Sequence, residues 1–240
     1  MLISPMSTGG RALVLAMLLA TGVASEAQST GDDAEPTTRS AETLDLTVKG
    51  KPRPRDDVGG SWNWFVAAGR MTNGSLVHDF YFDYGGWQDI YLISGEVGYT
   101  MKNDNAFTRF FEPVVSNIEG VMNVTYQNET NQNVIEFNPY MMFRWSNFPW
   151  NKTIRTTFGL GGGFSYATPI PEIEKNPNDA EGHYNNLMHF IAVEATFALP
   201  QHDDWQLVYR LHHRSGIFGL LQADNEGNTA VEIGLRHYFK

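Results

Sequence analysis

Apolar and polar residues alternate along most of the chain after residue 60, with the period of two that is typical of β-strands. The alternation is most regular in 135–145, where one face carries Ile135, Phe137, Pro139, Met141, Phe143 and Trp145. Polar side chains such as Glu136, Asn138 and Arg144 occupy the positions between them. The pattern predicts eight strands, at about 62–70, 90–101, 111–126, 133–146, 153–167, 187–199, 205–213 and 230–239.

The predicted connections differ in length at the two ends of these strands. Short turns are expected near 102–109, 147–152 and 200–204, and long loops near 71–89, 168–186 and 214–229, whereas the loop near 127–132 is short. Most of the strands approach the ten or so residues that cross a bilayer at a tilt. The pattern therefore predicts an all-β protein, an eight-stranded antiparallel outer-membrane β-barrel over residues 61–240. A soluble β-sandwich is the alternative at the level of the fold.

Tryptophans and charges agree with a barrel. If the first strand runs outward, one end of the barrel gathers Trp62, Trp64, Trp145, Trp150 and Trp205, and Trp87 lies at the opposite rim. Amphipathic rings prefer the headgroup layers of a membrane. One face of the strands carries Glu96, Glu136, Glu194, Glu232, Arg144, Arg210 and Arg236. In an eight-stranded barrel this face fills the interior, so we expect these groups to pair there and to exclude a wide channel.

The N-terminal 60 residues have a different composition. Residues 1–27 resemble a secretory signal peptide, with Arg11 before an apolar run and a cleavage site expected after Ala24 or Ala27. The alternative, a membrane anchor, needs an apolar run of about 20 residues, and this one is shorter. Residues 28–60 are rich in Ser, Thr and acidic residues, which predicts a flexible periplasmic leader. We therefore expect an exported protein of the bacterial outer membrane.

Composition narrows the chemistry. The chain of 240 residues has no cysteine, which excludes disulfides, thiolate–zinc sites and thiol nucleophiles. Its formal net charge of −10 disfavours nucleic acid as a partner. Neighbouring residues on a strand point apart, so His212 and His213 are poorly placed to share a metal ion. We expect neither a metal nor another cofactor.

One strand offers a candidate catalytic pair. The positions predicted to face lipid on this strand are Trp205, Leu207, Tyr209 and Leu211. The same parity brings His213 and Ser215 to the outer surface, with their Cα atoms about 7 Å apart. An imidazole at this spacing can serve as the base for a serine nucleophile, with a third polar group holding its other nitrogen. The next loop offers Asp224, Glu226 and Asn228 for that role. The alternative is that His213 and Ser215 are ordinary polar residues at the membrane interface.

The C-terminal quarter of the chain also carries a resemblance. The segment 210–219 (RLHHRSGIFG), Gly227 with Asn228, and the closing 234–239 (GLRHYF) resemble the end of the outer-membrane lipid A 3-O-deacylase (PagL), or acyloxyacyl hydrolase-like, family. This resemblance implies an eight-stranded barrel whose catalytic His and Ser correspond to His213 and Ser215. It implies a third catalytic residue, for which Asn228 is the first candidate and Glu226 the second. Backbone amides of Gly216, Ile217 and Phe218 would hold the oxyanion, although Gly216 replaces an Asn of the family.

The resemblance implies a carboxylic ester hydrolase that removes a 3-O-linked acyl chain from lipid A. The expected partners are lipopolysaccharide of the outer leaflet, the membrane itself and, through the closing strand that ends near Phe239, the barrel-insertion machinery. Two other functions are possible for such a barrel. One is a catalytically silent barrel with a structural or surface-interaction role, and the other is an uptake barrel for small molecules.

Overall fold

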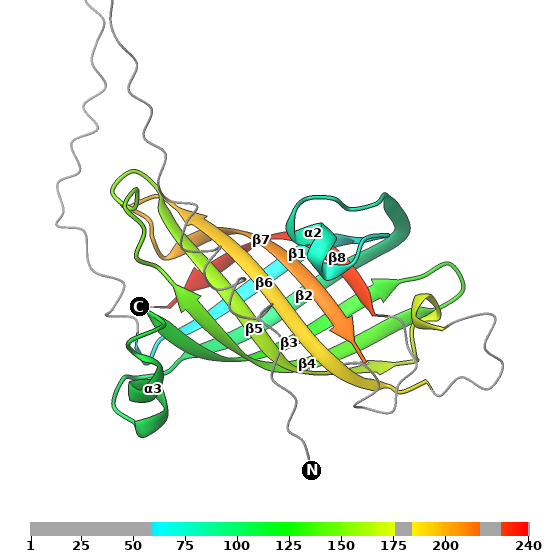
Figure 1. Ribbon diagram of the computed structural model, residues 1–240, viewed down its shortest axis with the longest axis horizontal. Coiled ribbons are helices and arrows are strands. Elements are labelled where there is room, and N and C mark those ends of the chain that lie inside the picture. The colour runs from blue at the N-terminus through cyan, green and yellow to red at the C-terminus, as the bar shows by residue number, and fades with distance from the viewer. Residues whose placement is uncertain (1–58, 176–183, 217–226, 240) are drawn as a thin grey trace, which may run out of the picture. The chain divides into compact units, whose positions relative to one another are not determined.

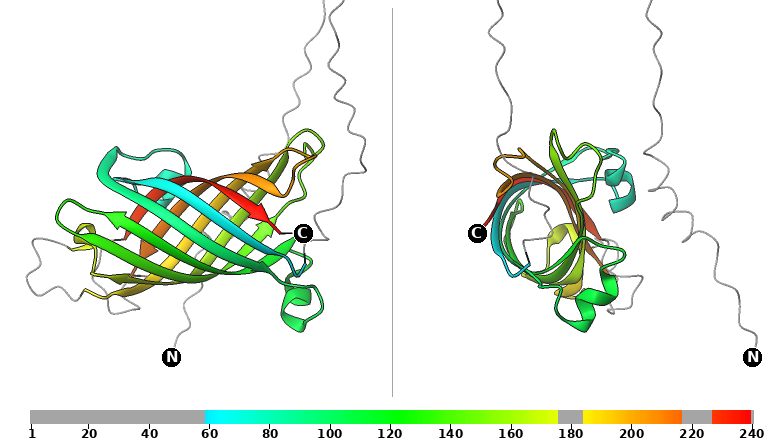
Figure 2. Two further views of the ribbon diagram at one scale, coloured as in Figure 1. Left: turned by 180° about the vertical axis from the view of Figure 1, so that it is seen from behind. Right: turned by 90° about the vertical axis from the view of Figure 1, so that its left-hand side faces the viewer.

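The alternating segments pair into a closed sheet in the computed structural model, which describes residues 59–175, 184–216 and 227–239 (Figure 1). The strands are β1 (Trp62–Thr72), β2 (Trp87–Thr100), β3 (Asn117–Asn128), β4 (Asn133–Trp145), β5 (Arg155–Thr168), β6 (Leu187–Ala198), β7 (Trp205–Ser215) and β8 (Asn228–Tyr238). Each strand pairs antiparallel with the next, and β1 pairs with β8 to close the ring seen in Figure 2. The prediction of an eight-stranded antiparallel barrel is confirmed, and the β-sandwich alternative is wrong because this sheet closes on itself.

One predicted strand boundary is wrong by six residues. The strand expected to begin at 111 begins at Asn117, and the chain before it forms helix α3 (Ala106–Phe111). The side chain of Asn105 caps this helix by accepting a hydrogen bond from the Thr108 amide at 2.9 Å. The ring of Phe111 packs on the ring of Phe143, on the outer wall of β4, with centroids 5.3 Å apart. The end of this helix therefore contacts the outer wall of the barrel, and the connection is longer than the predicted short turn.

The interior of the barrel is filled by paired charges, as the alternation predicts. Arg210 Nη2 donates to Glu96 Oε2 at 2.6 Å and also to Glu194. Arg236 Nη1 donates to Glu194 Oε2 at 2.8 Å, and Arg236 Nη2 donates to Glu96 Oε1 at 2.8 Å. Arg144 bridges Glu194 and Glu119, at 2.7 and 2.8 Å. All of these side chains are buried, so a network of paired charges fills part of the described interior, beside buried apolar side chains such as Phe65 and Phe190.

A short 3₁₀ turn, η2 (Glu172–Glu174), enters the lumen at the end of the barrel opposite to the two termini of the sheet. The carboxylate of Glu174 is buried and accepts from Arg214 Nε at 2.7 Å. Ile173 packs against an apolar cluster formed by Met71, Ile90, Leu92 and Ala230. This turn therefore covers the polar core from the side of the β5–β6 connection.

The outer surface of the barrel is apolar. Its exposed side chains include Val66, Ile93, Val97, Leu160, Leu207, Ile233 and Leu235. Of the predicted girdle, Trp62, Trp150 and Trp205 are exposed at the end where β1 begins and β8 ends. Among the described residues, no helix is long and apolar enough to cross a membrane. A closed ring of strands that is polar inside and apolar outside leaves no strand edge unpaired in lipid, which is the arrangement of a membrane-spanning barrel.

Candidate functional site

The outer face of β7 carries the predicted pair at the end of the strand that lies away from the two termini. Alternation along β7 sends His212 and Arg214 into the lumen, where His212 Nε2 lies 2.9 Å from Glu136 Oε2. His213 and Ser215 point the other way and are both partly exposed. The structure therefore brings these two side chains to the same exterior patch, at the spacing of alternate residues on one strand face.

The imidazole of His213 is held by the neighbouring strand. Thr229 on β8 pairs directly with His213 in the ladder, and Thr229 Oγ1 lies 2.9 Å from His213 Nδ1. When Nδ1 carries the proton, it donates a hydrogen bond to the Thr229 hydroxyl oxygen, and Nε2 becomes the basic nitrogen. A Cβ atom at Gly227 would lie 3.1 Å from His213 Cε1 and 2.6 Å from the Arg214 carbonyl oxygen. Glycine at 227 thus lets the chain pass closely beside the ring.

The expected third residue is not where the resemblance implies. Asn228 pairs with Arg214 in the ladder and shares its inward parity, and its side-chain amide donates to Glu174 Oε1 at 2.6 Å inside the barrel. Its contact with the His213 ring is a backbone hydrogen bond. Because adjacent residues on a strand face opposite sides, Thr229 rather than Asn228 presents a side chain to His213. Glu226, the second candidate, lies outside the described residues.

The expected oxyanion site is described only in part. Gly216 follows Ser215 directly at the end of β7 and is buried. Ile217 and Phe218 lie outside the described residues. The described part of the chain therefore leaves one glycine of the three expected amides next to the serine.

A second imidazole, which sequence reasoning missed, stands across from Ser215. His189 on β6 pairs directly with Ser215, and Ile191 pairs with His213. His189 shares the outward parity of Ile191 and is partly exposed. Two signals in the sequence point to it: the parity of the sixth strand extends to residue 189, and a tight hairpin between 198 and 205 fixes which residues face each other.

The connection between β1 and β2 folds over the outer wall beside this patch. It contains helix α2 (Leu76–Phe80), which packs against β7 and β8 (Figure 1). Thr72 Oγ1 donates to Asp79 Oδ2 at 2.5 Å and lies 3.1 Å from the Thr229 carbonyl oxygen. Leu211 faces outward by parity, yet it is only 2% exposed. Burial raises the pKa of the Asp79 carboxyl, and the Thr72 hydroxyl opposes this effect. The β1–β2 connection, including α2, thus covers the outer wall next to His213.

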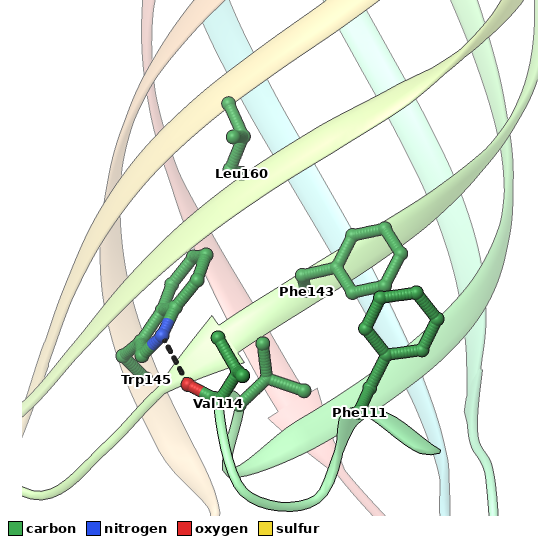
Figure 3. A pocket seen from close by; sticks show the side chains of 6 residues that line it. Phe111, Val114, Phe143, Trp145 and Leu160 are labelled. Carbon is green, nitrogen blue, oxygen red and sulfur yellow. Dashed lines mark hydrogen bonds between the residues drawn. The ribbon is translucent and has the colours of Figure 1, made fainter. Parts of the chain in front are cut away.

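A separate apolar pocket lies at the other end of the barrel, on the outer wall beside α3 (Figure 3). It has a volume of about 200 Å³, and its walls include Phe111, Phe143 and Trp145. Trp145 Nε1 donates to the Val114 carbonyl oxygen at 2.7 Å and so fixes one side of the pocket. The pocket borders the end that carries the tryptophans, so it is remote from Ser215 and is no part of the candidate catalytic patch.

Within residues 59–175, 184–216 and 227–239, no three His, Asp or Glu side chains are arranged to hold a metal ion. Among the described residues, the exterior patch brings together the hydroxyls of Ser215 and Thr229 and the imidazoles of His189 and His213.

Comparisons with family models, curated proteins and solved structures give little similarity to this chain. No family model matches the chain, and no curated protein matches it. Solved structures that resemble it include the outer-membrane enzyme PagL, with 12% identity, a TM-score of 0.42, and coverage of 73% of this chain and 98% of that one. The N-terminal β-barrel domain of Pseudomonas aeruginosa OprF has 10% identity and a TM-score of 0.42, covering 75% of this chain and 98% of that one. Neisserial surface protein A has 9% identity and a TM-score of 0.43, with the same coverage. The function therefore has to be argued from the residues of this chain.

Proposed function

We propose that the protein is a PagL-like outer-membrane hydrolase that removes a 3-O-linked acyl chain from lipid A. The observation that supports the proposal is the exterior position of His213 and Ser215, with His213 Nδ1 held by Thr229 Oγ1 at 2.9 Å. A serine and a base that face lipid are suited to an ester carried by a membrane lipid. The same pair inside the packed lumen would meet no substrate.

The orientation of the barrel decides which leaflet the pair meets. β1 begins and β8 ends at the end that carries the tryptophans, and Ser215 closes β7 at the opposite end. Barrels of this class have short turns in the periplasm and longer loops outside, and the longest connection here, 169–186, lies at the end with Ser215, although the β2–β3 connection at the other end is also long. With the termini of the sheet in the periplasm, Ser215 lies at the outer leaflet, where lipopolysaccharide carries its ester-linked acyl chains.

The proposed reaction is serine-type acyl transfer. Ser215 Oγ attacks the ester carbonyl carbon while His213 Nε2 takes the hydroxyl proton. The tetrahedral intermediate collapses, the bond from the carbonyl carbon to the sugar oxygen breaks, and His213 returns the proton to that oxygen. Water, deprotonated by His213, then attacks the acyl-serine, so that a free fatty acid leaves and Ser215 recovers its proton. Thr229 keeps the imidazole in the tautomer that this sequence needs.

Mass spectrometry of lipid A tests the proposal. Cells that express the wild-type chain should yield lipid A that lacks one 3-O-linked acyl chain, and cells that express Ser215→Ala should yield the complete molecule. Ser94→Ala is a matched control, because the Ser94 hydroxyl contacts Thr125 inside the barrel at 2.7 Å, away from lipid. The same acyl pattern from wild type and Ser215→Ala would contradict the proposal.

A specific observation favours a second candidate, a catalytically silent barrel with a structural or surface-interaction role. The side-chain partner of His213 is the neutral hydroxyl of Thr229, which stabilises an imidazolium less well than a carboxylate does. The Asn228 amide is engaged by Glu174 in the lumen. Unaltered lipid A from a folded wild-type barrel would favour this candidate. The packed charges of the lumen disfavour an uptake barrel, whereas liposome swelling by the purified protein would favour that function.

A further inference from the structure

The second imidazole of the exterior patch has a geometry that suits a different task from that of His213. His189 and Ser215 are direct partners across the β6–β7 ladder, and directly opposed residues have their Cβ atoms about 5 Å apart. His213, two residues along the same strand, lies about 7 Å from Ser215 at Cα. An ester carbonyl bound at Ser215 would therefore meet one imidazole along β7 and another across from it on β6.

The two histidines differ in how the protein holds them. The Nδ1 atom of His213 is engaged by Thr229. The Nδ1 atom of His189 is buried and has no hydrogen-bond partner among the described residues. A buried polar atom without a partner costs free energy. The protein thus fixes the ring of His213 as a base would require, whereas among the described residues no hydrogen bond holds Nδ1 of His189.

The outer wall also leaves room beside His189. Gly162 on β5 faces outward and pairs with Ile191, the outward neighbour of His189 on β6. A Cβ atom built on Gly162 would meet only His189 Nε2, at 4.0 Å. Every larger residue at 162 would project a side chain into this space. The absence of a side chain at Gly162 therefore leaves the space next to the Nε2 atom of His189 unfilled by that residue.

Attack by Ser215 on an ester requires a hydrogen-bond donor for the oxyanion, and Gly216, the next residue, has no side chain to supply it. When a serine attacks an ester, the carbonyl oxygen becomes negative, and donors aimed at that oxygen lower the barrier. We propose that His189 is a further catalytic residue, which donates a ring N–H to the carbonyl oxygen of a lipid-linked ester as it becomes an oxyanion on Ser215. This inference rests on the proposed function. His189 keeps its proton throughout and forms no covalent bond.

The test compares two replacements of His189 in the purified full-length barrel, with lipopolysaccharide as the substrate and released fatty acid as the readout. His189→Ala removes the donor and should lower kcat by about 100-fold to 1,000-fold, with KM nearly unchanged. His189→Gln retains a side-chain N–H and should recover part of the lost kcat. The acid limb of the pH–rate profile should stay in place in both variants, because His213 remains the base. His202→Ala, in the exposed β6–β7 turn, is the matched control and should behave as wild type.

The outcomes separate this inference from the proposed function. Each variant must first show the heat-modifiable gel mobility of a folded barrel. Release that depends on Ser215 and His213 but is unchanged in His189→Ala would overturn the role of His189 and leave the proposed function standing. An equal loss in His189→Ala and His189→Gln, with a displaced acid limb, would identify His189 as a base and overturn its role as a donor. The absence of release by the folded wild type would overturn both.

Discussion

Replacing Arg210 by Met should strongly destabilise the barrel, because Arg210 is the centre of the buried ion network. Its guanidinium forms ion pairs with Glu96 and Glu194, and Arg210 Nη2 also donates a hydrogen bond to Tyr140 Oη at 3.0 Å. It also lies over the ring of Phe65, with Cζ at 4.2 Å from the centroid. Methionine has a similar length and no charge, so the substitution removes the cation while keeping most of the apolar packing.

The magnitude follows from what remains after the substitution. Breaking a buried pair by removing one partner costs about 3–5 kcal/mol, because the other charge stays buried. Here Glu96 keeps Arg236 at 2.8 Å, and Glu194 keeps both Arg236 and Arg144, at 2.8 and 2.7 Å. The remaining partners limit the loss, so we expect about 3 kcal/mol, at the lower end of that range.

Urea unfolding in lipid vesicles, followed by tryptophan fluorescence, measures the effect. Arg70→Met is the matched control, because Arg70 forms a 3.0 Å pair with Asp89 in which the two side chains are 38% and 87% exposed. A solvated pair of this kind contributes less than about 1 kcal/mol. A loss in Arg210→Met no greater than that in Arg70→Met would refute the interpretation of the lumen as a packed, charge-paired core.

Three further predictions concern the exterior patch and the β1–β2 connection that covers the wall beside it. Thr229→Val removes the hydroxyl that holds His213 and should lower kcat about tenfold, the equivalent of a 1.4 kcal/mol hydrogen bond, while Thr229→Ser retains activity in the fatty-acid assay. Gly227→Ala forces a Cβ to 2.6 Å from the Arg214 carbonyl oxygen, so urea unfolding should show a loss of about 1–3 kcal/mol, and an unchanged midpoint would contradict the close approach. Burial raises the pKa of the Asp79 carboxyl in the folded protein. Its contribution to the stability of the β1–β2 connection is therefore fully present below the unfolded pKa of about 3.8, and it falls as the pH rises through the pKa of the folded state. Amide hydrogen exchange in α2, corrected for the intrinsic rate, should therefore lose protection with rising pH in wild type and not in Asp79→Asn.

The barrel itself could be predicted from the sequence because alternation records which side of a strand faces lipid. The parity of Glu96, Glu194 and Arg210 correctly assigned them to the lumen, and a closed sheet of eight strands leaves that lumen only enough room for side chains. The helix α3 was missed for a related reason. Its last phenylalanine, Phe111, lies close to Val114 and Val115, so the predicted strand included the end of the helix, and the Asn105 cap that starts the helix is a local signal of one residue.

The exterior patch could be predicted only in part. Parity along one strand is sufficient to place His213 and Ser215 on the same face, because both lie on β7. The partners of that pair come from other strands, and they depend on the register between strands. Thr229 is opposite His213, and His189 is opposite Ser215, only because the β7–β8 and β6–β7 ladders align them so. A shift of one residue in either register would exchange inward and outward side chains. Asn228, one residue before Thr229, shows the effect of a single position, because its side chain points into the lumen.

The most direct test of the account is hydrolysis of purified lipopolysaccharide by the purified barrel in water enriched in ¹⁸O. The wild-type barrel should release a 3-O-linked fatty acid that carries one ¹⁸O atom, because water cleaves the acyl-serine formed on Ser215. Folded Ser215→Ala and His213→Ala barrels should release none above background. Release that is unchanged in Ser215→Ala, or no release by the folded wild-type barrel, would contradict the account.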